Sequence, residues 1–190
     1  MRQRDENKRE AIFEATVGLL NEVGYDGVSM SKIAAAAGVS PSTIYVYFDN
    51  KDDMLKKVYL DVKKKLFCAM TRGLTADMPV RSAVSLICHN LLDFMRGNEG
   101  YLLFLEQSAG SPRIDALWQD EVKSLFEPIF ALFERGAAEG VLKKAPPLLL
   151  CSFCFHPVAQ IYKQQCRSRF AVSGLDYELV FRMCWDAVRA

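Results

Sequence analysis

The sequence has few of the residues on which enzyme chemistry usually depends. It contains two histidines, His89 and His156, and neither is placed beside a plausible nucleophile and acid. His89 falls on the polar side of a predicted helix, where we expect it to be solvated. A glycine-rich phosphate-binding loop is also absent from the sequence. An enzyme is therefore the least favoured class of function.

Residues with the spacing of metal ligands are also scarce. Two of the six cysteines, Cys151 and Cys154, lie beside a histidine in the stretch CSFCFH. They are three residues apart and share a helix face, whereas His156 lies roughly 200° further round the helix from Cys154. No second pair of ligands with zinc spacing occurs. We therefore expect no metal and no cofactor, and we expect these cysteines to be small buried hydrophobic residues without a redox role.

Long apolar runs and an excess of charge are missing as well. The sequence has no run of about 18 apolar residues, so no membrane span is expected. The charged N-terminus lacks the apolar segment of a signal peptide, so we expect a cytoplasmic protein with reduced cysteines. The net charge is +1, with 51% hydrophobic and 25% charged residues. This composition is typical of a globular protein and provides no overall positive field for nucleic acid.

Helical periodicity recurs along the chain, and strand alternation is not sustained anywhere. We therefore predict an all-α fold of about nine helices. The predicted helices cover residues 7–24, two short segments within 29–48, and then 51–70, 80–96, 99–109, 114–139, 147–169 and 175–189. Helical spacing also predicts a buried face on three of these helices. On the helix at 7–24 the face comprises Ile12, Ala15, Thr16, Leu19 and Val23. On the helices at 51–70 and 80–96 the faces comprise, respectively, Leu55, Val58, Tyr59, Val62, Leu66 and Met70, and Val80, Val84, Ile87, Leu91 and Phe94. Asn50 with Asp53 three residues later predicts a cap for the helix at 51–70.

Residues 29–51, SMSKIAAAAGVSPSTIYVYFDNK, have the pattern of two short helices joined by a tight turn. Gly38 can adopt the left-handed conformation that ends the first helix. Ser40 is a good N-cap for the second helix, with the following proline at the first helical position. Ile44 and Phe48 share one face and can anchor that helix to its own domain. A helix-turn-helix of this kind presents its second helix to the major groove of DNA.

Nine positions of this segment carry a family resemblance: Gly38, Val39, Ser40, Thr43, Ile44, Tyr45, Tyr47, Phe48 and Lys51. A glycine turn, Val-Ser, a Thr-hydrophobic-Tyr-x-Tyr-Phe stretch and a lysine three residues further on resemble the TetR family of transcriptional regulators. The resemblance covers about residues 7–60, and the rest of the chain matches only in size and helical texture. It implies a DNA-binding domain at 1–50 and a ligand-binding and dimerisation domain at 51–190, in which 51–73 is a connecting helix.

The resemblance also implies which side chains contact DNA, namely Ser29, Lys32, Pro41, Ser42, Thr43, Tyr45, Val46, Tyr47 and Lys51. Pro41, Ser42 and Tyr45 would face bases, and Val46 would face a thymine methyl or the sugar backbone. Hydroxyl groups and lysine suit phosphate contacts. The second helix contains no Arg, Asn or Gln, so specificity would depend on tyrosine, serine, water and DNA shape. Packing of Tyr45 and Tyr47 against their own domain is the alternative.

The C-terminal helices indicate a homodimer. Residues 148–155 are apolar almost all round, and such a helix must be buried on every side. A second copy of the chain is the natural cover, although a single-chain core that wraps the helix is the alternative. The resemblance implies that the last two helices form the interface, with predicted contacts at Phe155, Tyr162, Tyr177, Val180, Phe181, Cys184, Trp185 and Val188. Such a pair would read a palindrome with half-sites one turn, about 34 Å, apart.

The resemblance further implies a small-molecule effector that releases the protein from DNA, with the helix at 51–70 transmitting the change. The candidate contacts are Asn90, Phe94, Phe104, Trp118, Phe126, Phe153 and His156, which suit an apolar or aromatic compound. Each aromatic residue also fits an ordinary core. His156 shares a polar stripe with Ser152, Gln160 and Lys163, which fits a ligand cavity, a hydrated dimer interface or a solvent-facing surface.

We therefore favour a homodimeric transcriptional repressor whose partners are palindromic double-stranded DNA and a small effector. We expect no association with a membrane. Two alternatives remain. One is a DNA-binding dimer without a small ligand, controlled by a protein partner, which a filled C-terminal core would favour. The other is an enzyme that carries a DNA-binding domain, which would need His156 beside Cys154 in a cleft, or an acid with a strongly shifted pKa.

Overall fold

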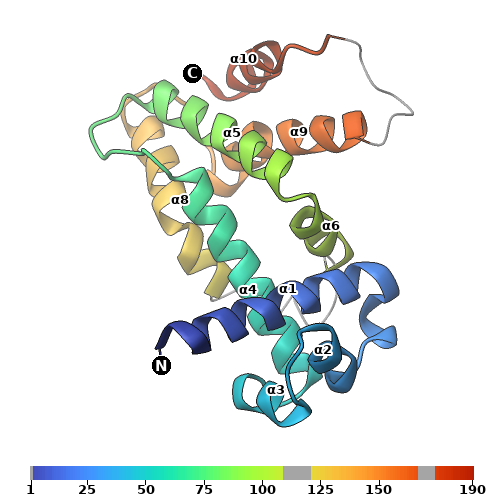
Figure 1. The fold of residues 1–190 in the computed structure, drawn as a ribbon. Helices are drawn as coiled ribbons and strands as arrows, with labels where there is room; N and C mark the ends of the chain where they lie inside the picture. Colours follow the sequence, from blue (N-terminus) through green and yellow to red (C-terminus); the bar gives the residue numbers. More distant parts are fainter. Residues whose placement is uncertain (1, 109–120, 167–173) are drawn as a thin grey trace. The chain divides into compact units, whose positions relative to one another are not determined.

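The computed structural model describes residues 2–108, 121–166 and 174–190, with side chains from residue 6 onward. Within these ranges the chain forms α-helices and no β-strand (Figure 1), which confirms the all-α fold class. The helices are α1 (Arg2–Gly27), α2 (Met30–Ala36), α3 (Pro41–Tyr47), α4 (Lys51–Met70), α5 (Val80–Gly97), α6 (Glu99–Ser108), α8 (Lys123–Ala138), α9 (Pro147–Cys166) and α10 (Tyr177–Val188). The remaining parts of the helices predicted at 114–139 and 147–169 lie outside the described residues.

Two compact units share these helices. The first unit takes in the described parts of residues 1–64 and 98–123, and the second unit takes in those of 65–97 and 124–190. The boundary falls inside α4, and α6 belongs with α1, α2 and α3 rather than with α5. These units are defined by packing. The expected boundary at residue 50, between a DNA-binding domain and a ligand-binding and dimerisation domain, is defined by function and stays a prediction.

The core of the first unit includes one face of α1. Ile12 and Thr16 are buried as predicted, and Phe13, Val17 and Leu20 are buried beside them. This face is covered because α1 packs against α2 and α6. Burial of these apolar side chains supplies the main favourable free energy for holding the short helices of the unit together.

The predicted face of α1 is only partly buried. Val23 is 49% exposed, and Ala15 and Leu19 are only half-buried. Helical geometry is interrupted directly after Val23, because Gly24 has φ 67° and ψ 178°. The covered face is the one that faces α2 and α6, and the spacing of apolar residues within α1 could not identify these partners.

α4 is capped and buried as its sequence predicts. The Asn50 side chain accepts a hydrogen bond from the Asp53 backbone N–H at 2.9 Å. In return, the Asp53 carboxylate accepts one from the Asp49 N–H at 3.0 Å. These bonds satisfy donors that have no partner within the helix. The whole predicted apolar stripe of α4, which ends at Met70, is buried.

The second unit is organised around α5, which packs against α9 and α10 (Figure 1). All five residues of the apolar stripe predicted for α5 are buried. Two edge-to-face ring pairs, Phe67 with Phe126 at 5.6 Å and Phe133 with Phe155 at 5.8 Å between centroids, contribute to the packing of this unit. The unit therefore has its own hydrophobic core.

Gly136 in α8 is a site where one added methyl group should destabilise the second unit. An ideal Cβ there would lie 2.5 Å from Leu142 Cδ1 and 2.9 Å from Val80 Cγ1, inside a buried helix face. We expect Gly136→Ala to lower the free energy of unfolding by about 1–3 kcal/mol, because overpacking outweighs the better helix propensity of alanine. Urea denaturation followed by circular dichroism measures this change.

The same substitution at Gly18 is the matched control. An added Cβ at Gly18 meets nothing within 4 Å, and the residue is exposed inside α1. We expect Gly18→Ala to raise the free energy of unfolding by about 0.5–1 kcal/mol. A stabilised Gly136→Ala variant would show that α8 can move away from Leu142 at little cost.

Candidate nucleic-acid interface

The turn between α2 and α3 is built by local hydrogen bonds. Ser29 caps α2 by accepting a bond from the Lys32 N–H at 3.2 Å, and Ser40 caps α3 by accepting one from the Thr43 N–H at 3.3 Å. Gly38 lies between the helices with φ 66°, in the left-handed region that glycine adopts without strain. The turn, the cap at Ser40 and the proline at the first position of α3 are as predicted.

One face of α3 is anchored in the first unit. Ile44 and Phe48 are buried, as their spacing predicts, and α3 packs against α2. At the C-terminal end of α3, the Lys57 ammonium donates a hydrogen bond to the Tyr47 carbonyl oxygen at 3.1 Å. A cation at this position also interacts favourably with the helix dipole. α3 is therefore held from α2 on one side and from α4 at its end.

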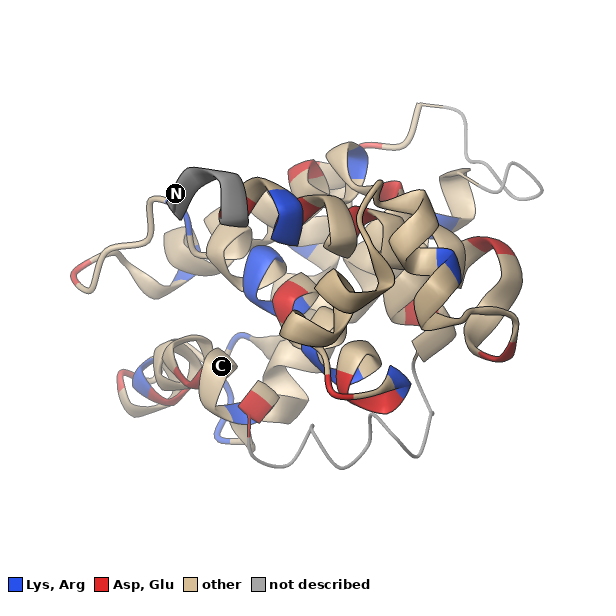
Figure 2. Cartoon of the chain, turned by 60° about the horizontal axis from the view of Figure 1, so that its bottom comes forward, with Lys and Arg blue, Asp and Glu red and all other residues tan. Residues whose placement is uncertain are grey.

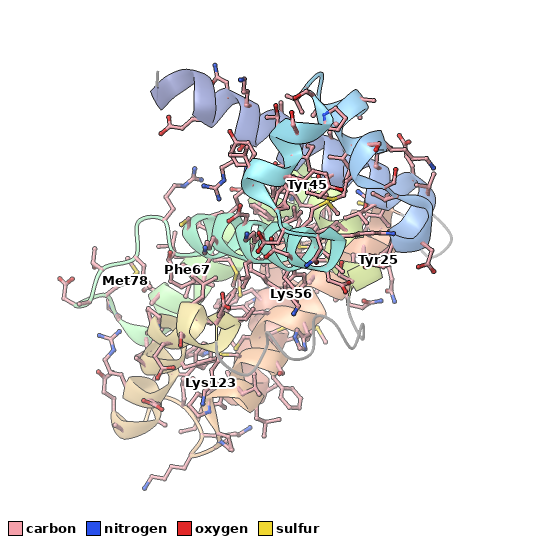
Figure 3. The ribbon with its side chains drawn as sticks, turned by 90° about the horizontal axis from the view of Figure 1, so that it is seen from below. Tyr25, Tyr45, Lys56, Phe67, Met78 and Lys123 are labelled. Atoms are coloured by element: carbon pink, nitrogen blue, oxygen red, sulfur yellow. The ribbon has the colours of Figure 1, made fainter. Side chains whose placement is uncertain are left out.

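The other face of α3 projects large side chains away from the protein. Tyr45 (labelled in Figure 3) is 58% exposed and Val46 is 77% exposed. Pro41 and Ser42 on the same helix are also exposed. Packing of Tyr45 against its own domain is thereby ruled out. Tyr47 is only half-buried and lies at 6.5 Å from the Phe48 ring, so it is partly a packing residue. An exposed aromatic and an exposed aliphatic group on a fixed helix suit contacts with base edges and thymine methyl groups.

Hydroxyl groups gather at the start of α3. The Ser40 Oγ lies 2.9 Å from Ser42 Oγ and 2.8 Å from Thr43 Oγ1. At the start of α2, the Lys32 ammonium donates to the Gly27 carbonyl oxygen at 2.7 Å. Phosphate oxygens accept hydrogen bonds from hydroxyl and ammonium groups. The side chains expected to contact phosphates are therefore near helix starts, although several also hold local structure.

Tyr25 is a residue that sequence reasoning did not identify. The Lys51 ammonium lies 4.1 Å from the centre of the Tyr25 ring, and the Tyr25 hydroxyl donates to the Asp52 carboxylate at 2.5 Å. Lys51 is thus held at the start of α4 by a cation–π contact. The signal was its place in the last turn of α1, four residues before the cap of α2 at Ser29.

Charge gives little general attraction for DNA. Lys and Arg are interspersed with Asp and Glu along the described helices (Figure 2), in keeping with the net charge of +1. Near α3, Asp49, Asp52 and Asp53 offset nearby lysines. Since each neutralised phosphate adds to affinity and to its salt dependence, we infer that only a few phosphate contacts are available per chain.

Asp53 makes the stability of the first unit sensitive to acid. Partial burial would raise its pKa, but the Lys57 ammonium at 2.8 Å and the Asp49 N–H outweigh burial and lower the pKa below its ordinary value. A lowered folded-state pKa adds stability above the unfolded pKa of about 3.9, and this stability is lost as pH falls through the folded pKa. We expect Asp53→Asn to cost about 0.3–1 kcal/mol at pH 6 and less at pH 3, by urea denaturation. Equal costs at both pH values would contradict this assignment.

The residues expected to bind an effector fall in both units, and their role stays a prediction. Asn90 and Phe94 are buried in α5, and the Asn90 amide donates to the Met70 and Arg72 carbonyl oxygens at 3.1 and 2.8 Å, which is a structural role. Phe104 is buried in the first unit, because α6 packs on α1. The other candidates are a half-buried Phe126, an exposed Phe153, an exposed His156, and Trp118, which lies outside the described residues.

The residues expected to form a dimer interface lie mostly inside the second unit. Phe155, Tyr162, Val180, Phe181, Cys184, Trp185 and Val188 are buried within a single chain, and Tyr177 is half-buried. They fill the space where α10, α9 and α5 pack together. The exposed apolar residues of the same two helices are instead Leu148, Leu149, Phe153, Leu179 and Met183, which we call the exposed apolar set. The predicted contacts therefore lie mostly on the inner faces of α9 and α10, and a dimer interface on these helices stays a prediction.

The cysteines and histidines do not form a reactive centre in the described residues. Burial raises the pKa of both Cys151 and Cys154 to about 12, which leaves them as protonated, unreactive thiols. His156 is exposed, whereas Cys154 is buried, so they do not share a cleft. His89 is exposed as expected, with Glu178 at 2.6 Å from its Nε2. Among the described residues, no three His, Cys, Asp or Glu side chains come together as a metal site would need.

The described helices include none with the length and apolar character that crossing a membrane requires.

Two family models match separate segments of the chain. The model described as "Bacterial regulatory proteins, tetR family" matches residues 12–58, which contain α2, the turn and α3. The model described as "Tetracyclin repressor-like, C-terminal domain" matches residues 79–189, more than half of the chain. The first match therefore covers the helix pair that exposes Tyr45 and Val46.

The chain is also similar to individual proteins. It is 29% identical over 148 residues to the uncharacterized HTH-type transcriptional regulator YdeS of Bacillus subtilis, a match that spans 75% of this chain and 71% of YdeS. A crystal structure of a TetR family transcription regulator from Marinobacter aquaeolei VT8 has 29% identity and a TM-score of 0.89, over 100% of this chain and 99% of that one. FadR from Bacillus subtilis, solved in complex with stearoyl-CoA, shares the fold at 17% identity with a TM-score of 0.74, over 94% of this chain and 96% of FadR.

These relatives are transcriptional regulators. The geometry leads to the same conclusion, because α3 is anchored on one face and exposes a contact surface on the other. Since a family model also covers more than half of the sequence, the chain belongs to the TetR family of bacterial regulatory proteins and is a DNA-binding helix-turn-helix transcriptional regulator.

Proposed function

We propose that the protein is a homodimeric repressor that binds a palindromic operator and is released from it by a small apolar ligand. The observation that carries the DNA-binding part is the exposure of Tyr45 and Val46 on a helix whose opposite face is buried. In this proposal, the exposed face of α3 enters the major groove and the hydroxyls at its start contact phosphates. Two such helices about 34 Å apart would read the two halves of the operator.

The exposed apolar set supports a second copy of the chain as the dimer partner. Phe153 is 51% exposed and Met183 is 66% exposed, on two helices that pack against each other. Large apolar groups gathered on one helix pair are costly in water and mark interaction surfaces. The paired helices α9 and α10 would contribute the same surface from each subunit, as a two-fold interface requires.

The effector is the less constrained part of the proposal. The crystal structure of FadR from Bacillus subtilis, which shares the fold, contains stearoyl-CoA. We therefore take a long-chain acyl-CoA as the first ligand class to test, in agreement with the apolar compound expected from the sequence. Of the predicted contacts in the second unit, we retain Phe94 and Phe126, because the Asn90 amide bonds to backbone carbonyl oxygens and Phe153 and His156 are exposed. A dimer without a small ligand, controlled by a protein partner, is the alternative outcome.

α6 provides a second route by which a ligand could act on α1, in addition to α4. The Asn21 amide donates to the Gly100 carbonyl oxygen at 2.8 Å, and the Tyr101 ring lies 5.5 Å from the Phe13 ring, edge to face. The Tyr101 hydroxyl also donates to Glu14. α6 follows α5 directly in the sequence, so a displacement of the end of α5 would be passed to α1. A coupling of about 1–3 kcal/mol would change operator affinity about fivefold or more.

The test is selection of bound sequences from a random duplex pool with the purified protein at moderate salt. We expect a palindrome, and we expect it to be lost with Tyr45→Ala. If no sequence is enriched, the DNA-reading role of α3 is wrong for this chain. The recovered operator then allows a release assay with acyl-CoA of increasing chain length, using free CoA as the control. Failure of every acyl chain to release the operator would favour control by a protein partner.

A further inference from the structure

A surface groove lies between α5 and α10 in the second unit. Its volume is about 490 Å³, within the range of sites for small molecules. Charged and hydroxyl side chains line it from both helices, above an apolar base. The lining residues are Arg81, Ser82, Ser85, Leu86 and His89 on α5, and Glu178, Phe181 and Arg182 on α10.

The groove has two arginines that are not well neutralised. In the described part of the chain, no carboxylate lies within ion-pair distance of Arg81. Arg182 has Asp176 at 3.9 Å, the outer limit of an ion pair, and both arginines are exposed. The Glu178 carboxylate already accepts a hydrogen bond from His89 Nε2 at 2.6 Å. Both guanidinium groups line the groove, where an anion would accept charge-assisted hydrogen bonds from them.

We propose that this groove binds a small organic anion, in which a carboxylate or phosphate group is held by Arg81 and Arg182. Guanidinium groups bind both kinds of anion through paired N–H donors. Ser82 and Ser85 add hydroxyl donors on the α5 side of the groove. Leu86 and Phe181 form an apolar base that suits a short hydrocarbon part of the ligand. The ligand would bridge α5 and α10, and the site does not depend on DNA binding.

Isothermal titration calorimetry with sodium phosphate, sodium hexanoate and monohexyl phosphate, at constant ionic strength, tests the site. We expect hexanoate or hexyl phosphate to bind, and the better of the two identifies the preferred anion. We expect Arg81→Gln and Arg182→Gln each to weaken that binding at least about tenfold, since each removes a charged, paired donor. Hydrogen exchange should slow in α10 when the anion is bound, because the ligand holds α10 to α5.

Two variants control for loss of fold and for general charge. Arg72→Gln removes an exposed arginine of the second unit that does not line the groove, and it should leave the affinity unchanged. Ser82→Asp places a carboxylate in the groove within the first turn of α5, a position that favours acidic residues, and it should abolish binding in a folded protein. The proposal is overturned if none of the three anions binds, or if the variants at Arg81 and Arg182 bind as tightly as the wild type.

Discussion

Replacing Tyr45 with alanine is expected to reduce affinity for the selected operator about tenfold to a hundredfold. Tyr45 is the largest exposed side chain of α3 and presents both an aromatic ring and a hydroxyl group. A specific contact with a base pair contributes about 1–3 kcal/mol of discrimination, and about 1.4 kcal/mol corresponds to a factor of ten. Fluorescence anisotropy with labelled operator and with a scrambled duplex, at one salt concentration, measures the loss. Because Tyr45 is expected to contact bases, the scrambled duplex should be affected little.

Lys51→Gln is the contrasting variant, because Lys51 is expected to contact phosphate. It should weaken binding to operator and scrambled duplex by similar factors. The slope of log affinity against log salt concentration should fall in magnitude by about one. The Tyr45→Ala variant should keep the salt dependence of the wild type. If a folded Tyr45→Ala protein binds the operator as the wild type does, then the exposed face of α3 is not the surface that reads DNA.

Local chemistry explains why the helix-turn-helix could be predicted in detail. The cap at Ser40, the proline after it and the left-handed Gly38 each act within a few residues, and all three were found as expected. The stripes of α4 and α5 were also correct, because a helix with one apolar stripe has one face to bury. These features need no knowledge of distant parts of the chain.

The errors all concern which distant element covers a helix. Val23 was assigned to the core, but the covered face of α1 is set by α2 and α6. α6, which carries Phe104, packs in the first unit through a contact made across about eighty residues of sequence, which residue spacing did not predict. α9 is apolar almost all round, so periodicity could not tell its inner face from its exposed one. Such choices depend on long-range packing, which residue spacing alone does not contain.

The exposed apolar set leads to the second large effect, the loss of the dimer on introduction of a charge. We expect Phe153→Glu or Met183→Glu to convert the protein from dimer to monomer, with the dimer dissociation constant raised at least about a hundredfold. An unpaired carboxylate buried in an interface costs several kcal/mol, whereas the same group is hydrated in the monomer. Both positions are more than half exposed in a single chain, so the monomer should remain folded. Sedimentation velocity over a concentration series measures the equilibrium.

Val46→Glu separates dimerisation from DNA reading, because it introduces the same charge at an exposed apolar position on α3. It should remain a dimer and lose operator binding, since its carboxylate would face the bases and phosphates of the operator. Phe153→Glu should also lose operator affinity although its α3 is unaltered, because a single helix-turn-helix makes too few contacts for tight binding. If Phe153→Glu and Met183→Glu both sediment as dimers, the subunits associate through another surface. That surface would then set the distance between the two copies of α3 in the dimer.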